Sequence, residues 1–182
     1  IMFLARDGLR FLGATARIGD FNLSVASRNI QDNITEFTAS YADVVSLTIR
    51  SKSQYRIMGF ASGQIDSVAE GYIGTQFADQ DASSFSWSQT KGIKAYRTTS
   101  ATSGSSEVIL FVGETGYIYR LDTGNTFDGS VISASFFTPF MSINDPKVRK
   151  TLFKATTYYD PEGNVDGNLT FKYDFQRPNV IQ

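Results

Sequence analysis

Hydrophobic and polar positions along this chain mostly follow the two-residue period of β-strands. The clearest stretch begins with the unbroken apolar run 108–112, which predicts a strand buried on both faces. Residues 113–116 then supply two glycines for a tight turn. The residues of the return segment that share one face are Tyr117, Tyr119 and Leu121. We therefore predict an antiparallel hairpin with one face in a core, followed by a second turn over 122–125.

The first residues of the chain resemble this hairpin. An apolar segment over 1–5 is followed by a turn over 6–8 and by a second alternating segment over 9–12. Superposing Gly8 on Gly116 places Phe3 on Phe111 and Leu9 on Tyr117. Two interpretations stay open: a repeated unit of a radial all-β array, or the ordinary likeness of two hairpins whose first strands are apolar.

The other predicted strands follow the same logic. A second hairpin over 44–49 and 54–60 has Val45, Leu47 and Ile49 on one face and points Tyr55 and Ile57 inward. The Ser/Thr/Gly-rich residues 98–106 predict a flexible surface linker. Further strands are predicted at 71–73, 85–88 with Trp87 facing a core, 92–97, 131–138, 151–159 and 168–175, the last two forming a C-terminal hairpin.

One segment changes period. Leu23, Ile30, Ile34 and Phe37 recur at helical spacing and predict a short amphipathic helix over 23–37. Its N-cap is expected at Ser24 or at Ser27. The helix is expected to pack on its own chain, with docking on an adjacent subunit as the alternative.

Composition narrows the chemistry. The 182 residues include no cysteine and no histidine, which excludes disulfides, thiolate metal sites and every histidine-dependent mechanism within this chain. The net charge of −1 gives no global attraction to nucleic acid or to anionic membranes. No apolar run is long enough for a membrane helix, and Arg6 and Asp7 interrupt the apolar start, so we expect neither a membrane span nor a signal peptide. Because residue 1 is isoleucine, we expect a fragment or a processed chain.

Acidic and basic residues supply the only candidate sites. The candidates for the carboxylate pair of a glycosidase are Asp122, Asp128, Asp145 and Glu162. A role in a turn explains Asp122 and Asp128 better. Asp79 and Asp81 lack the full pattern of a calcium loop. Arg50, Lys52 and Arg56 make one hairpin tip basic, as a solvated end or as a contact to phosphate or to an acidic partner surface. We predict no catalytic, cofactor-binding or metal-binding residue, and no cofactor.

Several stretches, in order, resemble the β-propeller tail hub or nozzle (tail tubular) proteins of short-tailed, podovirus-like bacteriophages. They include Lys52-Ser53-Gln54-Tyr55-Arg56, Gly116-Tyr117-Ile118-Tyr119-Arg120 and Asp145-Pro146-Lys147-Val148-Arg149-Lys150, together with residues 3–10, 24–34, 87–94, 124–129 and 138–140. Each stretch is weakly specific by itself, and the ordered set is more so.

The resemblance implies a structural protein of the virion, without enzymatic activity. In that family the propeller forms a homo-oligomeric ring, about six copies, around the channel through which DNA is ejected. Its expected partners are the portal or adaptor and the tail fibres, with transient, non-specific contact to the exiting DNA. Residues 1–141 would be propeller-like blades, the C-terminal part of a longer propeller, and residues 142–182 a C-terminal β extension.

We therefore predict an all-β protein of antiparallel hairpins and propeller-like blades, with one short helix and a C-terminal β-hairpin extension. Its predicted function is that of a hub or nozzle component of a phage tail. Two alternatives remain: a carbohydrate-binding or carbohydrate-active β protein of the tail, and an intracellular propeller scaffold that binds peptides. Paired carboxylates with exposed aromatic side chains would favour the first alternative, and a monomer would favour the second.

Overall fold

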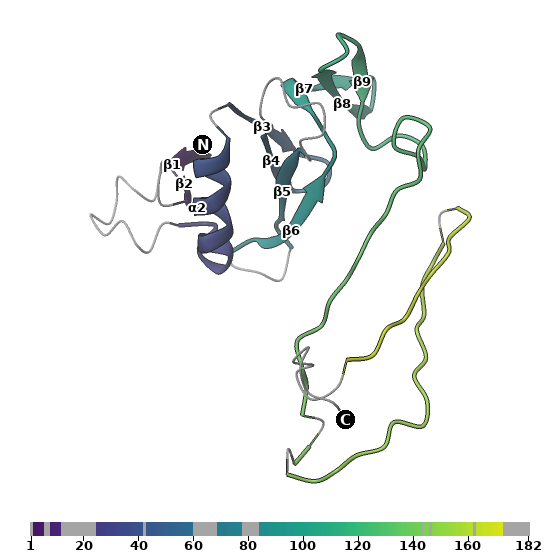
Figure 1. Cartoon of the computed structure of the whole chain (residues 1–182). Helices are drawn as coiled ribbons and strands as arrows, with labels where there is room; N and C mark the ends of the chain where they lie inside the picture. The colour runs from purple at the N-terminus through teal and green to yellow at the C-terminus, as the bar shows by residue number, and fades with distance from the viewer. Residues whose placement is uncertain are drawn as a thin grey trace. The chain divides into compact units, whose positions relative to one another are not determined.

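The structure, a computed structural model, describes residues 2–5, 8–11, 25–41, 43–59, 69–77, 84–142, 144–145, 147–161 and 163–172. The chain divides into two compact units, Ile1–Thr123 and Gly124–Gln182. The described strands and helices all belong to the first unit (Figure 1). The sequence-based boundary between residues 141 and 142 stays a prediction.

The first unit contains three antiparallel sheets, which confirms the all-β class. The first is the hairpin β1 (Met2–Ala5) and β2 (Gly8–Phe11). The second is a four-stranded meander in chain order: β3 (Val44–Ile49), β4 (Gln54–Gly59), β5 (Glu70–Thr75) and β6 (Ser86–Lys91). The third contains β7 (Ala95–Ser103), β8 (Ser106–Gly113) and β9 (Ile118–Arg120). The described sheets do not close into a propeller.

One helix packs on this framework. The 3-10 helix η2 (Arg28–Ile30) leads into α2 (Gln31–Ser40), which lies beside the β3–β6 sheet (Figure 1). Ile34 and Phe37 of α2 are buried with Ile57 and Tyr72 of the sheet. The Phe37 and Tyr72 rings meet edge to face, with centroids 5.5 Å apart. The predicted helix thus packs on its own chain, and two of the apolar residues that predicted it, Ile34 and Phe37, lie in the core.

The helix starts later than the sequence predicts, and Ser27 explains the difference. Ser27 makes no side-chain cap bond to the helix. Instead its Oγ accepts a hydrogen bond from the Leu9 amide at 3.0 Å, and both residues are fully buried. Ser24, the other predicted cap, lies outside the described residues. The Ser27 side chain therefore does not cap the helix, because it accepts a hydrogen bond from the buried amide of Leu9 in β2.

The predicted face assignments on the β3–β4 hairpin hold. Tyr55 and Ile57 point to the α2 side, while Leu47 and Ile49 point to the opposite side, where they form a second core with Ile109 of β8. Trp87 packs on the first core as expected, and its indole N–H donates to the Ala26 carbonyl at 3.1 Å. Both faces of the central strand β4 are buried, because α2 covers one and the third sheet contributes to covering the other.

The predicted flexible linker over residues 98–106 is wrong. These residues form most of β7 and the turn into β8. The Thr98 hydroxyl donates to the Ser46 carbonyl at 2.9 Å, and the Ser100 hydroxyl donates to the Thr48 carbonyl at 3.0 Å. The hydroxyl side chains of β7 therefore join two sheets along the line where β3 and β7 lie side by side, which we call the β3–β7 seam. Here hydrogen bonds from side chains to backbone carbonyls connect the strands.

The two hairpins compared above both form, but their registers differ by one residue. Leu4 pairs with Leu9 in the first hairpin. Superposition on Gly116 would then pair Val112 with Tyr117, whereas Val112 pairs with Ile118. A shift of one residue reverses the face on which every side chain of the return strand lies. The structure therefore gives no support to an exact repeat of this hairpin.

The second unit departs from the sequence-based prediction. The described residues from 124 to 172 contain no strand, only an isolated bridge between Phe127 and Ser130. The predicted strands 131–138 and 151–159 and the described part of 168–175 are unpaired segments without a ladder. The predicted C-terminal hairpin is therefore not formed by the residues that the structure describes, and residues 173–175 of it lie outside them. Isolated two-stranded hairpins are marginal in water, and the described residues of this unit include no further strand or helix on which one could pack.

Candidate functional site

Charged side chains gather where the third sheet meets the tip of the β3–β4 hairpin. We call Lys52, Arg56, Asp122 and Glu107 the charged junction. Arg56 projects from β4, Lys52 from the turn before it, Glu107 from β8, and Asp122 from the turn after β9. Residues from four segments of the chain thus meet at one place in the first unit.

Arg56 and Asp122 form the central pair. The two terminal nitrogens of Arg56 lie 2.9 Å from Oδ1 and 2.7 Å from Oδ2 of Asp122, a bidentate contact. Lys52 Nζ lies 2.6 Å from the same Oδ2. The Gln54 side-chain oxygen accepts from the Nε and one terminal nitrogen of Arg56, at 3.1 and 2.7 Å. The Arg56 side chain is only 8% exposed, so its charge is compensated almost entirely within the protein.

Asp122 stays ionised in this setting. Partial burial by itself raises the pKa of Asp122, but hydrogen bonds and charge from Arg56 and Lys52 outweigh it, so the pKa lies below its ordinary value. Its backbone is left-handed, with φ of 56°. Aspartate is among the few non-glycine residues that adopt this conformation readily. The turn predicted from the sequence is therefore present, and it aims the carboxylate at Arg56.

Glu107 closes the hairpin tip by a different contact. Its two carboxylate oxygens accept from the backbone amides of Arg50 and Ser51, at 3.2 and 2.8 Å. The Ser51 amide is the largest of the influences that lower the pKa of Glu107. The acidic groups that the structure places at the basic tip are thus Glu107 and Asp122 of its own chain, and a contact to phosphate or to an acidic partner stays a prediction.

The four candidate glycosidase carboxylates occupy separate settings. Asp122 belongs to the charged junction. Asp128 occupies a left-handed turn position with φ of 49°, and Asp145 Oδ1 accepts from the Lys147 amide at 2.9 Å. Glu162 lies outside the described residues. An ionised Asp122 held by two cations is poorly suited to donate a proton, so the geometry gives it a structural role.

Neither a metal centre nor a membrane helix is found among the described residues. No group of three or more acidic side chains in them is placed to hold a metal ion. Asp79 and Asp81 lie outside those residues. In the part of the chain that the structure describes, no helix has the length and apolar character to cross a bilayer.

An aromatic surface on the third sheet is the second candidate site. The Phe111 and Tyr119 rings stack with centroids 5.0 Å apart and an interplanar angle of 18°. Tyr117, 70% exposed, meets Tyr119 edge to face at 6.4 Å. The Tyr119 hydroxyl lies 2.9 Å from the Thr115 hydroxyl. The sequence predicted a shared face for Tyr117, Tyr119 and Leu121, and of these Leu121 packs on the Ile109 core.

A polar groove follows the β3–β7 seam. It has a volume of about 450 Å³ and is open to solvent. Its lining includes Ser46, Thr48, Thr98, Ser100, Arg50 and Glu107. The described lining has no aromatic side chain on which a sugar or a base would stack. No local pattern in the sequence signals this groove, because β3 and β7 are far apart along the chain.

The sequence matches no protein-family model, no curated protein and no solved structure.

Proposed function

We propose that this chain is a structural component of a short-tailed phage tail, part of a hub or nozzle ring around the DNA-ejection channel. The proposal starts from the ordered set of stretches that resemble this family. In this proposal the protein is not an enzyme, resides in the virion, and contacts the portal or adaptor and the tail fibres.

The observation that carries the proposal is how the chain uses its polar groups. The charged junction and the Thr98 and Ser100 hydroxyls connect one sheet to another through hydrogen bonds within the protein. The four-stranded antiparallel meander β3–β6 has the strand count and connectivity of a propeller blade. Rigid sheets cross-linked by polar side chains suit a subunit that must withstand mechanical force.

The near-neutral charge also favours a channel component. Each lysine or arginine that neutralises a phosphate strengthens DNA binding in a salt-dependent way. A net charge of −1 provides no such overall attraction, so DNA would pass with little retention. Strong, salt-sensitive retention of the protein on double-stranded DNA would argue against this role.

The mass of the particle tests the proposal directly. We expect the full-length protein to form a ring of identical copies, about six, visible by electron microscopy and measurable by light scattering. Labelling of intact virions with an antibody to this chain should place it at the tail. A stable monomer that is absent from tails would overturn the proposal.

The aromatic surface supports one alternative function, carbohydrate binding. One exposed tyrosine, Tyr117, lies at the end of the aromatic row and offers the flat apolar surface that sugar rings contact. Binding of a glycan that weakens about tenfold or more in Tyr117→Ala, but not in Tyr158→Ala, would favour this alternative. Tyr158 is the matched control because it is also exposed and lies in the second unit.

A further inference from the structure

The chain contains two peptide bonds between an aspartate and a proline. Asp145 precedes Pro146, and Asp160 precedes Pro161. The proline nitrogen belongs to a tertiary amide and carries no hydrogen. An aspartate carboxylate can attack its own backbone carbonyl carbon, because the two are held close together in one residue and the attack closes a five-membered ring. Both bonds therefore have the covalent features that allow a chain to cleave itself, and the surroundings of each bond decide how fast it breaks.

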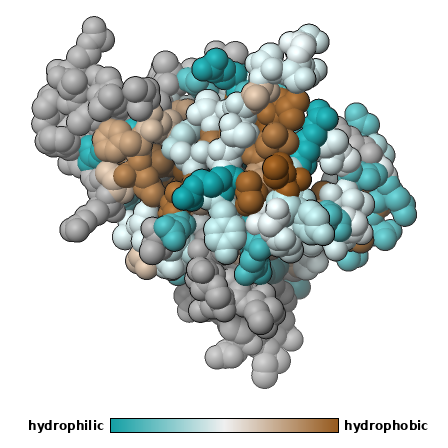
Figure 2. All heavy atoms as spheres, turned by 90° about the horizontal axis from the view of Figure 1, so that it is seen from above, coloured by the Kyte–Doolittle hydropathy of each residue, from teal (hydrophilic) through white to brown (hydrophobic). Residues whose placement is uncertain are grey.

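The carbonyl oxygen of Asp145 accepts hydrogen bonds from two donors. Lys150 Nζ donates to it, and the Val148 amide nitrogen lies 3.4 Å from the same oxygen. Lys150 Nζ also donates to the Ser142 carbonyl at 2.6 Å, which holds the ammonium group over this loop. Hydrophilic side chains reach the surface of the protein in several places (Figure 2), so what sets Lys150 apart is the carbonyl that it contacts. Two donors on one carbonyl oxygen stabilise the negative charge that develops there when the carbon is attacked.

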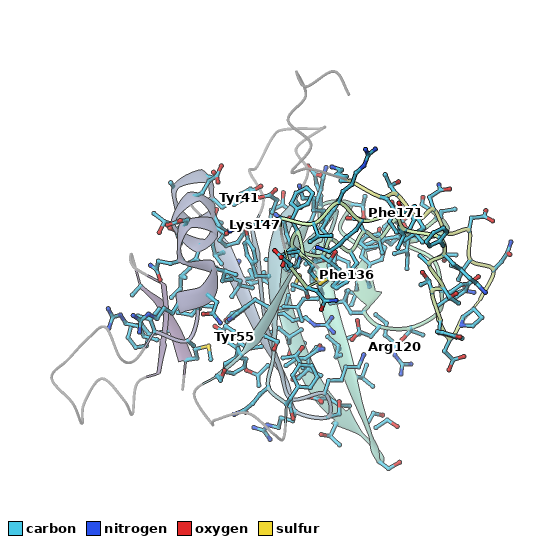
Figure 3. All side chains as sticks on the ribbon, turned by 90° about the horizontal axis from the view of Figure 1, so that it is seen from below. Tyr41, Tyr55, Arg120, Phe136, Lys147 and Phe171 are labelled. Carbon is cyan, nitrogen blue, oxygen red and sulfur yellow. The ribbon has the colours of Figure 1, made fainter. Side chains whose placement is uncertain are left out.

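The carboxylate of Asp145 is held in place beside this carbonyl. Its Oδ1 accepts from the amide of Lys147, which Figure 3 labels, at 2.9 Å. This hydrogen bond folds the side chain back over the turn that begins at Asp145. No described residue donates to the second oxygen, Oδ2. One carboxylate oxygen is thus used for orientation, and the other can act as the nucleophile.

The bond between Asp160 and Pro161 offers an internal comparison. It has the same two residue types, and Gly163 follows Asp160 by three positions, as Val148 follows Asp145. Among the described residues, none donates a hydrogen bond to the Asp160 carbonyl or to its carboxylate. The two bonds therefore share their covalent chemistry and differ in the donors that surround them.

We propose that the chain cleaves itself between Asp145 and Pro146, with Lys150 as a catalytic residue. Oδ2 of Asp145 forms a bond to its own carbonyl carbon, and the electron pair of the C=O double bond moves onto the oxygen, where Lys150 and the Val148 amide stabilise it. The bond from carbon to the proline nitrogen then breaks. Its electron pair stays on that nitrogen, which takes a proton from the solvent.

The first product carries a cyclic anhydride at Asp145. One water molecule opens this anhydride to two carboxyl groups, so the overall reaction is the hydrolysis of one peptide bond. The products are residues 1–145 and residues 146–182, the second beginning with the secondary amine of Pro146. Each chain reacts once, and the proposal holds whether or not the protein belongs to a phage tail.

Incubation of the full-length protein in mildly acidic buffer tests the proposal, because the proline nitrogen needs a proton to leave. Mass spectrometry measures the fragments from both bonds in one sample. A donor in a water-excluded site contributes about a hundredfold or more to the rate, and one in an exposed loop contributes less. We therefore expect cleavage after Asp145 to be about tenfold or more faster than cleavage after Asp160. In concentrated urea the two rates should become equal, because the contacts of Lys150 and Val148 are lost. Equal rates without urea, or a preference that persists in urea, would overturn the proposal.

Substitutions of Lys150 test its role. Lys150→Met removes the ammonium group and keeps an unbranched side chain, and it should lower the rate after Asp145 about tenfold while the rate after Asp160 stays the same. Lys150→Arg keeps a charged donor and should retain most of the cleavage. The matched control is Lys154→Met, since Lys154 is an exposed lysine of the same unit that forms no hydrogen bond with another described residue. An unchanged rate in Lys150→Met, or an equal loss in Lys154→Met, would contradict the proposed role.

Asp145→Ala tests the nucleophile. This variant lacks the carboxylate, so no fragment ending at residue 145 should form, whereas cleavage after Asp160 in the same sample shows that the conditions support the reaction. A fragment of residues 1–145 that still appears at the wild-type rate would mean that water or a contaminating protease attacks the bond directly, and the proposal would be wrong.

Discussion

Arg56 holds both carboxylate oxygens of Asp122, a residue 66 positions further along the chain. The contact ties the second strand of one sheet to the turn that follows the last strand of the next. Lys52 adds a second cation to the same oxygen, Oδ2. The pair therefore helps to hold the third sheet against the β3–β4 hairpin, together with the Thr98 and Ser100 hydroxyl bonds and the Ile109 core.

Asp122→Asn should destabilise the protein by about 2 kcal/mol, because the carboxamide has no negative charge, keeps only one acceptor oxygen for the buried guanidinium, and places a donor NH2 group where the other carboxylate oxygen accepted. Asparagine tolerates the left-handed backbone of this position, so the substitution isolates the loss of charge from backbone strain. The measurement is urea unfolding followed by circular dichroism. Asp128→Asn is the matched control: it occupies a similar left-handed turn outside the junction and should shift the midpoint very little.

The same pair makes stability depend on pH. The pKa of Asp122 is lower in the folded protein than in the unfolded chain. Its contribution is therefore complete above the unfolded value of about 4 and is lost as the pH falls through the lower folded value. The difference in unfolding free energy between wild type and Asp122→Asn should be constant from neutral pH to about pH 5 and shrink below about pH 4. A difference that persists undiminished at about pH 2 would contradict this account.

Ser27→Ala should cost about 1–3 kcal/mol, because it leaves the fully buried Leu9 amide without its acceptor. Thermal unfolding measures the loss. Thr35→Ala serves as the control, since Thr35 is an exposed residue of α2 whose hydroxyl bonds to the Gln31 carbonyl one turn back. If both variants lost the same free energy of unfolding, the loss would come from a general effect of alanine substitution near the helix and not from the unsatisfied Leu9 amide.

Thr98→Val should weaken the β3–β7 seam by about 0.5–1.5 kcal/mol while keeping the shape of the side chain. The loss follows from removing the hydroxyl that donates to the Ser46 carbonyl. Thr99→Val is the control, because neighbouring residues of a strand point to opposite faces. Hydrogen exchange of the β7 amides should accelerate in Thr98→Val alone. Equal exchange in the two variants would mean that the hydroxyl does not hold the seam.

Much of the first unit follows from local pattern. The hairpins β3–β4 and β8–β9, the helical spacing of Ile34 and Phe37, and the inward Trp87 were all predicted from the sequence, because periods of 2.0 and 3.6 residues report directly which face an element buries. The turn at Asp122 was also predicted from its residue types. The absence of cysteine and histidine excludes whole classes of chemistry by composition alone.

The errors share a different cause. The segment from Thr98 to Ser106 has the composition of a linker, and only its position beside β3 converts its hydroxyls into bonds between sheets. Serine is a common helix-capping residue, yet the Ser27 oxygen accepts a hydrogen bond from the Leu9 amide instead. In both cases a polar side chain had a local partner and a distant one, and packing decided between them.

The sequence by itself determined the strand periodicity, the β class and the set of available side-chain chemistries, because these depend on neighbours within a few residues. Only the tertiary structure decided that Arg56 meets Asp122, and that Glu107 accepts from the Arg50 and Ser51 amides. Those outcomes depend on which segments, far apart in the chain, come to share one surface, and no local pattern encodes that choice.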